Sequence, residues 1–179
     1  MIYCILGHGA SGKTTIQNLL KTEIPAITTY TTRPMRNNEI NGVHYHFLTN
    51  EKFQKKLEIN FFVEHYYIPE NAWYYGLSLH DIDYMNKNYT LVIEPNGYKK
   101  LTEQVDKKYL KCFYVHLSEH ERIIRMAKRK DRIEEIFRRI LSDRKDFQSF
   151  NDKADVILYS HDSIYNSNII LNHIKERAF

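Results

Sequence analysis

Short apolar segments alternate with amphipathic segments along most of the chain, which predicts strands that are followed by helices. The apolar runs are residues 2–6, 89–94, 111–117 and 155–159. Continuous apolar runs of this length indicate strands that are buried on both faces. Helical spacing follows over about residues 16–24, 98–105, 118–129, 134–147 and 163–175. The alternation predicts an α/β fold around a mainly parallel sheet.

A long segment near residues 28–77 breaks this alternation. Short strands are predicted at 28–32, 43–47, 61–67 and 73–76, with Asn and Gly turn signals between them. Asn50 is predicted to cap a short helix over residues 51–57, and Ser78 with Asp81 predicts another that ends near Met85. The segment is therefore predicted to be a β-rich insertion.

A glycine-rich stretch joins the first predicted strand to the first predicted helix, and we call these residues 7–15 the phosphate loop. It fits G-x-x-x-x-G-K-[ST] in the strand and helix context that this motif needs. Its N–H groups and the helix N-terminus would face phosphate oxygens. The expected nucleotide-binding residues are Gly7, His8, Gly9, Ala10, Ser11, Gly12, Lys13, Thr14 and Thr15.

Within this loop, Lys13 would reach the β- and γ-phosphates, and the hydroxyl of Thr14 would face Mg²⁺. The alternative is a Gly/Ser turn that precedes a helix by chance. The strand before the loop and the helix after it favour the phosphate-binding interpretation.

Composition adds limits to this picture. The 179 residues fit one domain, and no apolar run is long enough to span a membrane. A strand that starts at residue 2 leaves no room for a signal peptide, so we expect a cytoplasmic protein. Cys4 and Cys112 lie in apolar runs and are expected to be buried, reduced thiols. The basic stretch at residues 122–144 would suit nucleic acid, a polyphosphate ligand or a solvated helix face.

A second set of motifs resembles the guanylate kinase family. Residues 31–47 are similar to the family pattern T-T-R-x-x-R-x-G-E-x-x-G-x-x-Y-x-F, with Asn38 in place of its first glycine. Phe62-Val63-Glu64 resembles the family's F-x-E, and Tyr74-Tyr75-Gly76 resembles its Y-Y-G. The matches follow the family order over most of the chain.

The resemblance implies a three-layer P-loop NTPase fold with a monophosphate-binding insertion and a helical lid. It implies that Lys13, Arg125, Arg129 and Arg139 are catalytic. It also implies that the acceptor is bound by Thr29, Arg33, Arg36, Tyr45, Glu64, Tyr75 and Glu94. Guanidinium forks suit phosphate oxygens, and an ionised Glu64 could accept hydrogen bonds from N1–H and N2–H₂ of guanine.

Some positions depart from the family pattern. Leu77 stands where a hydroxyl residue usually contacts the guanine O6, although Ser78 is adjacent. Val92 replaces the usual acid two residues before Glu94, and His8-Gly9-Ala10 replaces the usual form of the phosphate loop. These changes crowd the base-reading side more than the phosphate-reading side.

The sequence therefore predicts an enzyme that moves the γ-phosphoryl group of ATP to GMP or dGMP, with Mg²⁺ bound at Thr14. The predicted core is residues 1–27, 88–119 and 148–179, with the acceptor insertion at about 28–87 and the lid at about 120–147. The expected partners are nucleotides, with no membrane or nucleic acid, and the protein is expected to be a monomer or homodimer. The alternatives are a kinase for another phosphorylated acceptor and a non-catalytic interaction module of the same fold.

Overall fold

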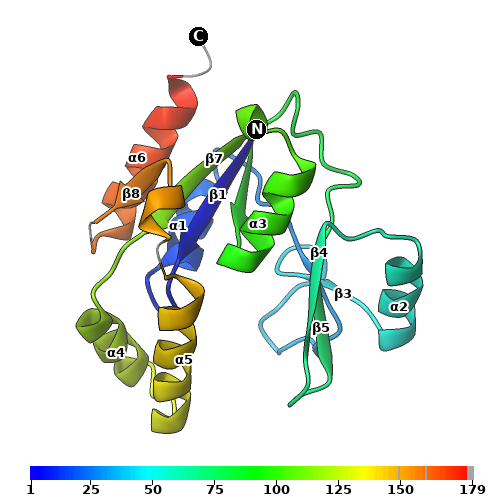
Figure 1. Cartoon of the computed structure of the whole chain (residues 1–179), viewed down its shortest axis with the longest axis horizontal. Helices are drawn as coiled ribbons and strands as arrows, with labels where there is room; N and C mark the ends of the chain where they lie inside the picture. Colours follow the sequence, from blue (N-terminus) through cyan, green and yellow to red (C-terminus); the bar gives the residue numbers. More distant parts are fainter. Residues whose placement is uncertain (149, 160, 177–179) are drawn as a thin grey trace.

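The computed structural model describes residues 1–148, 150–159 and 161–176. Its centre is a four-stranded parallel sheet in the order β6-β1-β7-β8 (Figure 1). These strands are β1 (Ile2–Gly7), β6 (Tyr89–Val92), β7 (Leu110–Val115) and β8 (Val156–Leu158). In the register of the sheet, Cys4 of β1 lies opposite Leu91 on one side and Cys112 on the other. The predicted α/β fold with a central parallel sheet is confirmed.

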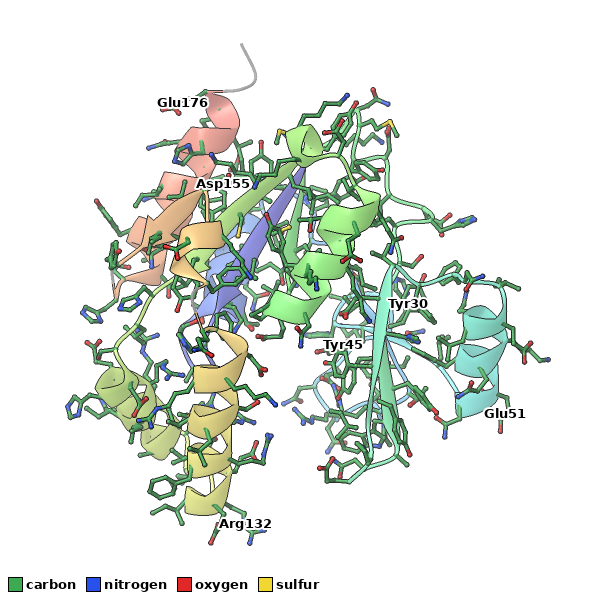
Figure 2. The ribbon with its side chains drawn as sticks, in the orientation of Figure 1. Tyr30, Tyr45, Glu51, Arg132, Asp155 and Glu176 are labelled. Carbon is green, nitrogen blue, oxygen red and sulfur yellow. The ribbon has the colours of Figure 1, made fainter. Side chains whose placement is uncertain are left out.

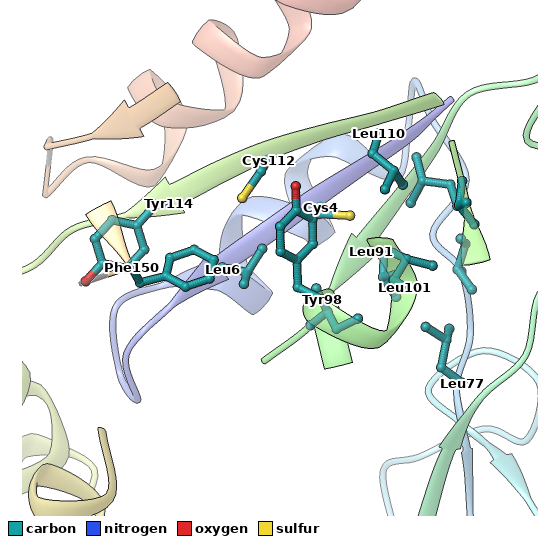
Figure 3. Close-up of a cluster of buried hydrophobic side chains, with 14 of the residues drawn as sticks. Cys4, Leu6, Leu77, Leu91, Tyr98, Leu101, Leu110, Cys112, Tyr114 and Phe150 are labelled. Carbon is teal, nitrogen blue, oxygen red and sulfur yellow. The ribbon is translucent and has the colours of Figure 1, made fainter. Parts of the chain in front are cut away.

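Helices cover both faces of this sheet, so the core has three layers. Because side chains alternate along a strand, Tyr3 and Ile5 pack with α1 (Lys13–Leu20) and α6 (Ser163–Lys175). Cys4 and Leu6 point to the other face, where they pack with Tyr98 and Leu101 of α3 (Pro95–Gln104), as Figure 3 shows. The double burial explains why β1 is an uninterrupted apolar run.

The acceptor insertion forms a second, smaller sheet in the order β3-β2-β5-β4. Its strands are β2 (Tyr30–Thr31), β3 (His46–Phe47), β4 (Glu64–Ile68) and β5 (Trp73–Leu77), and α2 (Asn50–Glu58) packs beside them. The ring of Phe53 on α2 stacks on Phe62 at 4.4 Å and on Tyr74 at 5.2 Å between centroids. This aromatic cluster holds α2 on the sheet.

Two helices, α4 (Glu119–Lys128) and α5 (Ile133–Asp146), occupy the segment predicted to be the lid, below the phosphate-loop end of the core in Figure 1. In Figure 1 the lid and the acceptor insertion lie on opposite sides of the molecule. Met126, Ile136 and Ile140 form a small apolar cluster between the two lid helices. Short 3-10 turns at Lys107–Tyr109 and Asn151–Lys153 precede β7 and β8.

Three local predictions were wrong. Residues 78–88 form turns and bends instead of a helix, because Leu79 and Tyr84, which would point to different sides of a helix, both pack on the core. The strand predicted at 43–47 is limited to β3, since residues 42–44 form a turn that is closed by a bridge between Asn41 and Tyr45. Thr49, not Asn50, caps α2, with its hydroxyl accepting from Lys52 N–H at 3.3 Å.

The two cysteines are buried and free, as the sequence predicted. They lie on neighbouring strands, and burial raises the pKa of both thiols, that of Cys112 to about 12, so both are protonated near neutral pH. Among the described residues, no helix has both the length and the apolar content needed to cross a bilayer.

Candidate active site

The phosphate loop closes tightly between β1 and α1. Gly12 has φ +104°, a left-handed conformation that favours glycine, and it stands at the start of α1. A Cβ at Gly7 would lie 2.7 Å from the backbone oxygen of Val115, so that position also needs glycine. The Lys13 side chain folds back over the loop, and its Nζ donates to the carbonyl oxygens of Gly7 and, at 3.2 Å, His8.

A cavity of about 370 Å³ opens beside the loop. It is lined by residues 10–15 and by Arg125, Lys128 and Arg129 of the lid. Cationic side chains therefore surround the N-terminus of α1, whose dipole also favours negative charge. This combination suits the phosphates of a nucleotide.

Of the three arginines that the sequence predicted in the lid, Arg125 and Arg129 line this cavity, whereas Arg139 lies beside Gly9 of the loop. Arg125 donates to the carbonyl oxygens of Ala10 at 3.3 Å and Ser11 at 3.2 Å, which fixes α4 to the loop. Arg129 and Arg139 share Asp131, which Arg129 contacts by a short hydrogen bond and Arg139 at 3.7 Å. Asp131 thus links these two guanidinium groups.

Arg33 contacts several other residues of the predicted acceptor site. It is 6% exposed, and its guanidinium donates two hydrogen bonds to Glu39, at 2.6 and 3.0 Å. This bidentate pair holds the pKa of Glu39 at about 2. The same guanidinium lies 5.4 Å from the ring centroid of Tyr45 and 5.6 Å from that of Phe47.

The predicted phosphate ligands Tyr45 and Tyr75 lie near Arg33. The rings of Tyr45 and Tyr75 are 6.1 Å apart, and burial raises the pKa of Tyr45, so its hydroxyl remains a donor near neutral pH. Figure 2 shows Tyr45 within the acceptor insertion. Arg36 is exposed, and its backbone N–H donates to Glu39 at 2.8 Å. Two arginines and two phenols could therefore surround one monophosphate.

Glu64 lies where β4 meets α3. A Cβ built on Gly97 of α3 would lie 2.9 Å from the Glu64 carboxylate, so the two residues are in direct contact. Burial raises the pKa of Glu64, and the charge of Glu94 adds to that effect, while Lys100 opposes it. A half-buried carboxylate of this kind can select a ligand by its hydrogen-bond donors.

Glu94 and Thr29 occupy different surroundings. The Glu94 carboxylate lies 3.4 Å from Lys13 Nζ, so it contacts the phosphate loop directly. Thr29 is half-buried, and its carbonyl oxygen accepts from His46 N–H at 2.8 Å.

Leu77 is 1% exposed in the core, and the hydroxyl of Ser78 accepts from His80 N–H.

Comparison with known proteins identifies the family. The family described as Guanylate kinase matches residues 2–175. The chain belongs to the guanylate kinase family. It is 31% identical over 184 residues to a guanylate kinase of Wigglesworthia glossinidia brevipalpis, covering 98% of this chain and 85% of the relative.

A guanylate kinase of Baumannia cicadellinicola subsp. Homalodisca coagulata is 31% identical over 152 residues, which are 79% of this chain and 73% of that protein. The crystal structure of guanylate kinase from Anaplasma phagocytophilum has the same fold. Its TM-score is 0.72 at 20% identity, over 99% of this chain and 85% of that one. Guanylate kinases are nucleoside monophosphate kinases that use ATP, so the predicted family and reaction are confirmed.

Three residues that contact the candidate site were not predicted from the sequence. Asp131 holds two lid arginines, and Asp143 of α5 accepts from the N–H of Gly9 at 3.0 Å. Arg122 is 2% exposed and pairs with Asp143, although a basic stretch usually predicts solvated side chains. The sequence did contain a signal for the burial of Arg122, because Arg122 and Met126 are four residues apart on the buried face of α4.

Replacing Gly97 with alanine should weaken GMP binding. The new methyl group would meet the Glu64 carboxylate and the buried side chain of Ile93, each at 2.9 Å, so both must shift, while alanine itself favours a helix. We expect KM for GMP to rise about tenfold or more, with KM for ATP unchanged, in steady-state assays. The matched control is Asn96→Ala on the exposed side of α3, and equal effects of the two variants would contradict the contact.

Proposed function

We propose that this chain transfers the γ-phosphoryl group of ATP to GMP or dGMP by direct in-line displacement. The supporting observation is that the N-terminus of α3 touches both halves of the site. Glu94, its N-cap residue, contacts Lys13 of the phosphate loop, and Gly97 contacts Glu64 of the acceptor insertion. A donor and an acceptor bound at these two places would both lie against the first turn of α3.

The roles of the residues follow from charge and geometry. Lys13 and the arginines at 125, 129 and 139 would stabilise the negative charge on the transferring group. Arg33, Arg36, Tyr45 and Tyr75 would hold the acceptor monophosphate. Its oxygen is already ionised at neutral pH, so the reaction needs no general base. Movement of the lid towards the acceptor insertion would exclude water.

Mg²⁺ fits this site as a partner of the nucleotide. The exposed hydroxyl of Thr14 is an oxygen donor at the mouth of the phosphate-loop cavity. Within the described ranges, His, Cys, Asp and Glu side chains do not gather in a group of three or more that could hold a metal ion. Thr14, nucleotide phosphates and water would therefore supply the ligands, and the ion would neutralise phosphate charge. A cytoplasmic location and a monomer or homodimer remain predictions.

The proposal is tested by measuring ADP release with GMP, dGMP, AMP, dTMP and a ribose phosphate as acceptors, with and without Mg²⁺. We expect activity only with Mg²⁺ and a guanine acceptor. Activity confined to a non-guanine acceptor would support the alternative kinase. GMP binding without turnover would support the interaction module.

Glu64→Gln should remove most of the preference for GMP over AMP. An ionised carboxylate can accept both hydrogen bonds from guanine, whereas an amide oxygen and its NH₂ group present one acceptor and one donor group. We expect the ratio of kcat/KM values to fall about tenfold or more. The readout is kcat/KM for both nucleotides, and an unchanged ratio would show that another residue reads the base.

The same variant has a pH signature. Because the pKa of Glu64 is raised above 4.5, the carboxylate protonates at a higher pH than an ordinary glutamate. KM for GMP in the wild-type protein should therefore rise as pH falls towards that pKa, and Glu64→Gln should remove this rise.

A further inference from the structure

A buried ion pair lies directly beneath the phosphate loop. Arg122 of α4 is 2% exposed, and its Nη1 donates to Oδ2 of Asp143 on α5. The same carboxylate oxygen accepts from the backbone N–H of Gly9 at 3.0 Å. A single oxygen atom thus connects both lid helices with the loop.

Asp143 and Arg139 face the loop together. They are four residues apart on α5, so they lie on the same side of the helix. A Cβ built on Gly9 would lie 3.4 Å from Asp143 Oδ2 and 4.0 Å from Cδ of Arg139. The hydrogen bond to Gly9 therefore sets the distance between the loop and the helix that carries Arg139.

The neighbouring His8 carries no positive charge that could compete with Arg122 for the Asp143 carboxylate. Burial and the positive charge of Arg122 lower the pKa of His8 to about 4, so His8 is neutral near pH 7. Its Nδ1 is hydrogen-bonded to the Tyr114 hydroxyl at 2.9 Å, and its ring centroid lies 4.4 Å from that of Phe147. Among the described residues, Nε of Arg122 has no hydrogen-bond partner, so Asp143 is the main group that compensates the buried charge of Arg122.

Another ion pair already joins the two lid helices. Glu119 of α4 and Arg144 of α5 form two hydrogen bonds at 2.7 and 2.9 Å on the exposed side. Burying a second pair would add little stability, because desolvation offsets its attraction. What distinguishes Asp143 is its contact with the phosphate loop.

We propose that Asp143 is a positioning residue for phosphoryl transfer. It fixes α5 against Gly9 and so places Arg139 beside the donor phosphates, with Arg122 compensating its buried charge. The inference rests on the proposed role of Arg139 in catalysis. It predicts that loss of Asp143 acts on transfer through Arg139 and leaves acceptor binding unchanged.

The test compares R122M/D143A with the wild-type protein. The double variant removes both buried charges, so neither is left unpaired, but it frees Gly9 N–H. We expect the melting temperature to change little, kcat to fall about 10- to 100-fold, and KM for GMP to stay constant. Glu119→Gln is the matched control, since it weakens the exposed pair between the same helices, and its kcat should stay at the wild-type level.

A double-mutant cycle separates positioning from a merely structural role. Arg139→Ala should lower kcat strongly in the wild-type protein but cost little more in R122M/D143A, because Arg139 is already misplaced there. Wild-type kcat in R122M/D143A, or a full Arg139→Ala effect in that variant, would overturn the proposal. So would an Arg139→Ala variant as active as the wild type. Absence of phosphate transfer to GMP by the wild-type protein would instead overturn the proposed function.

Discussion

Replacing Lys13 with alanine should abolish most phosphoryl transfer and leave the fold intact. The Lys13 ammonium contacts two loop carbonyls and Glu94, and its side chain is 11% exposed, so its charge is aimed at the loop where phosphate would bind. Such preorganised charge acts mainly on the transition state. We expect kcat to fall about 10³-fold in an ADP-release assay at saturating ATP and GMP.

The control for this variant is Lys21→Ala, at the exposed C-terminal end of the same helix. Its kcat should match that of the wild type, and both variants should melt within a few degrees of the wild-type protein. A Lys13→Ala protein that kept more than about a tenth of the wild-type kcat would contradict a role in transfer.

The second large effect is expected at Arg33. Lysine keeps the charge but cannot reproduce the fork that donates twice to Glu39 while it faces Tyr45. Loss of charge-assisted hydrogen bonds to the acceptor phosphate should raise KM for GMP about 10- to 100-fold in Arg33→Lys. KM for ATP should stay constant, because the donor half is unchanged.

Arg144→Lys is the matched control, since Arg144 also forms a bidentate pair with a glutamate but lies in the lid. Equal KM values for GMP in the wild type and Arg33→Lys would show that Arg33 has only a structural role. The Arg33–Glu39 pair also has a defined pH range. Because the pKa of Glu39 is lowered from 4.5 to about 2, its stabilising effect is complete above pH 4.5 and is lost as pH falls through 2.

The core and the phosphate loop were predictable from the sequence because their physics is local. Buried parallel strands give continuous apolar runs such as residues 2–6, and the phosphate loop needs glycines at fixed spacing. The arginines and tyrosines of the acceptor half were predicted by resemblance to a family, and their roles remain predictions.

The failures came from contacts between distant segments. Residues 78–88 have a helix-start signal, but packing of Leu79 and Ile82 on the core decides their conformation. Asp143 is 134 residues away from Gly9 along the chain, and nothing in the local pattern of α5 marks it. Side chains that connect two elements in this way are visible only once the elements have been placed.

The contacts of α3 with both halves of the site have a consequence for how binding of one substrate affects binding of the other. Lys13 and Glu64 belong to different halves, yet their contacts at Glu94 and Gly97 are three residues apart. A donor that draws Lys13 away from Glu94 alters the electrostatic surroundings of Glu64. The affinities for ATP and GMP should therefore be thermodynamically coupled, and the factor by which each changes the other must be the same.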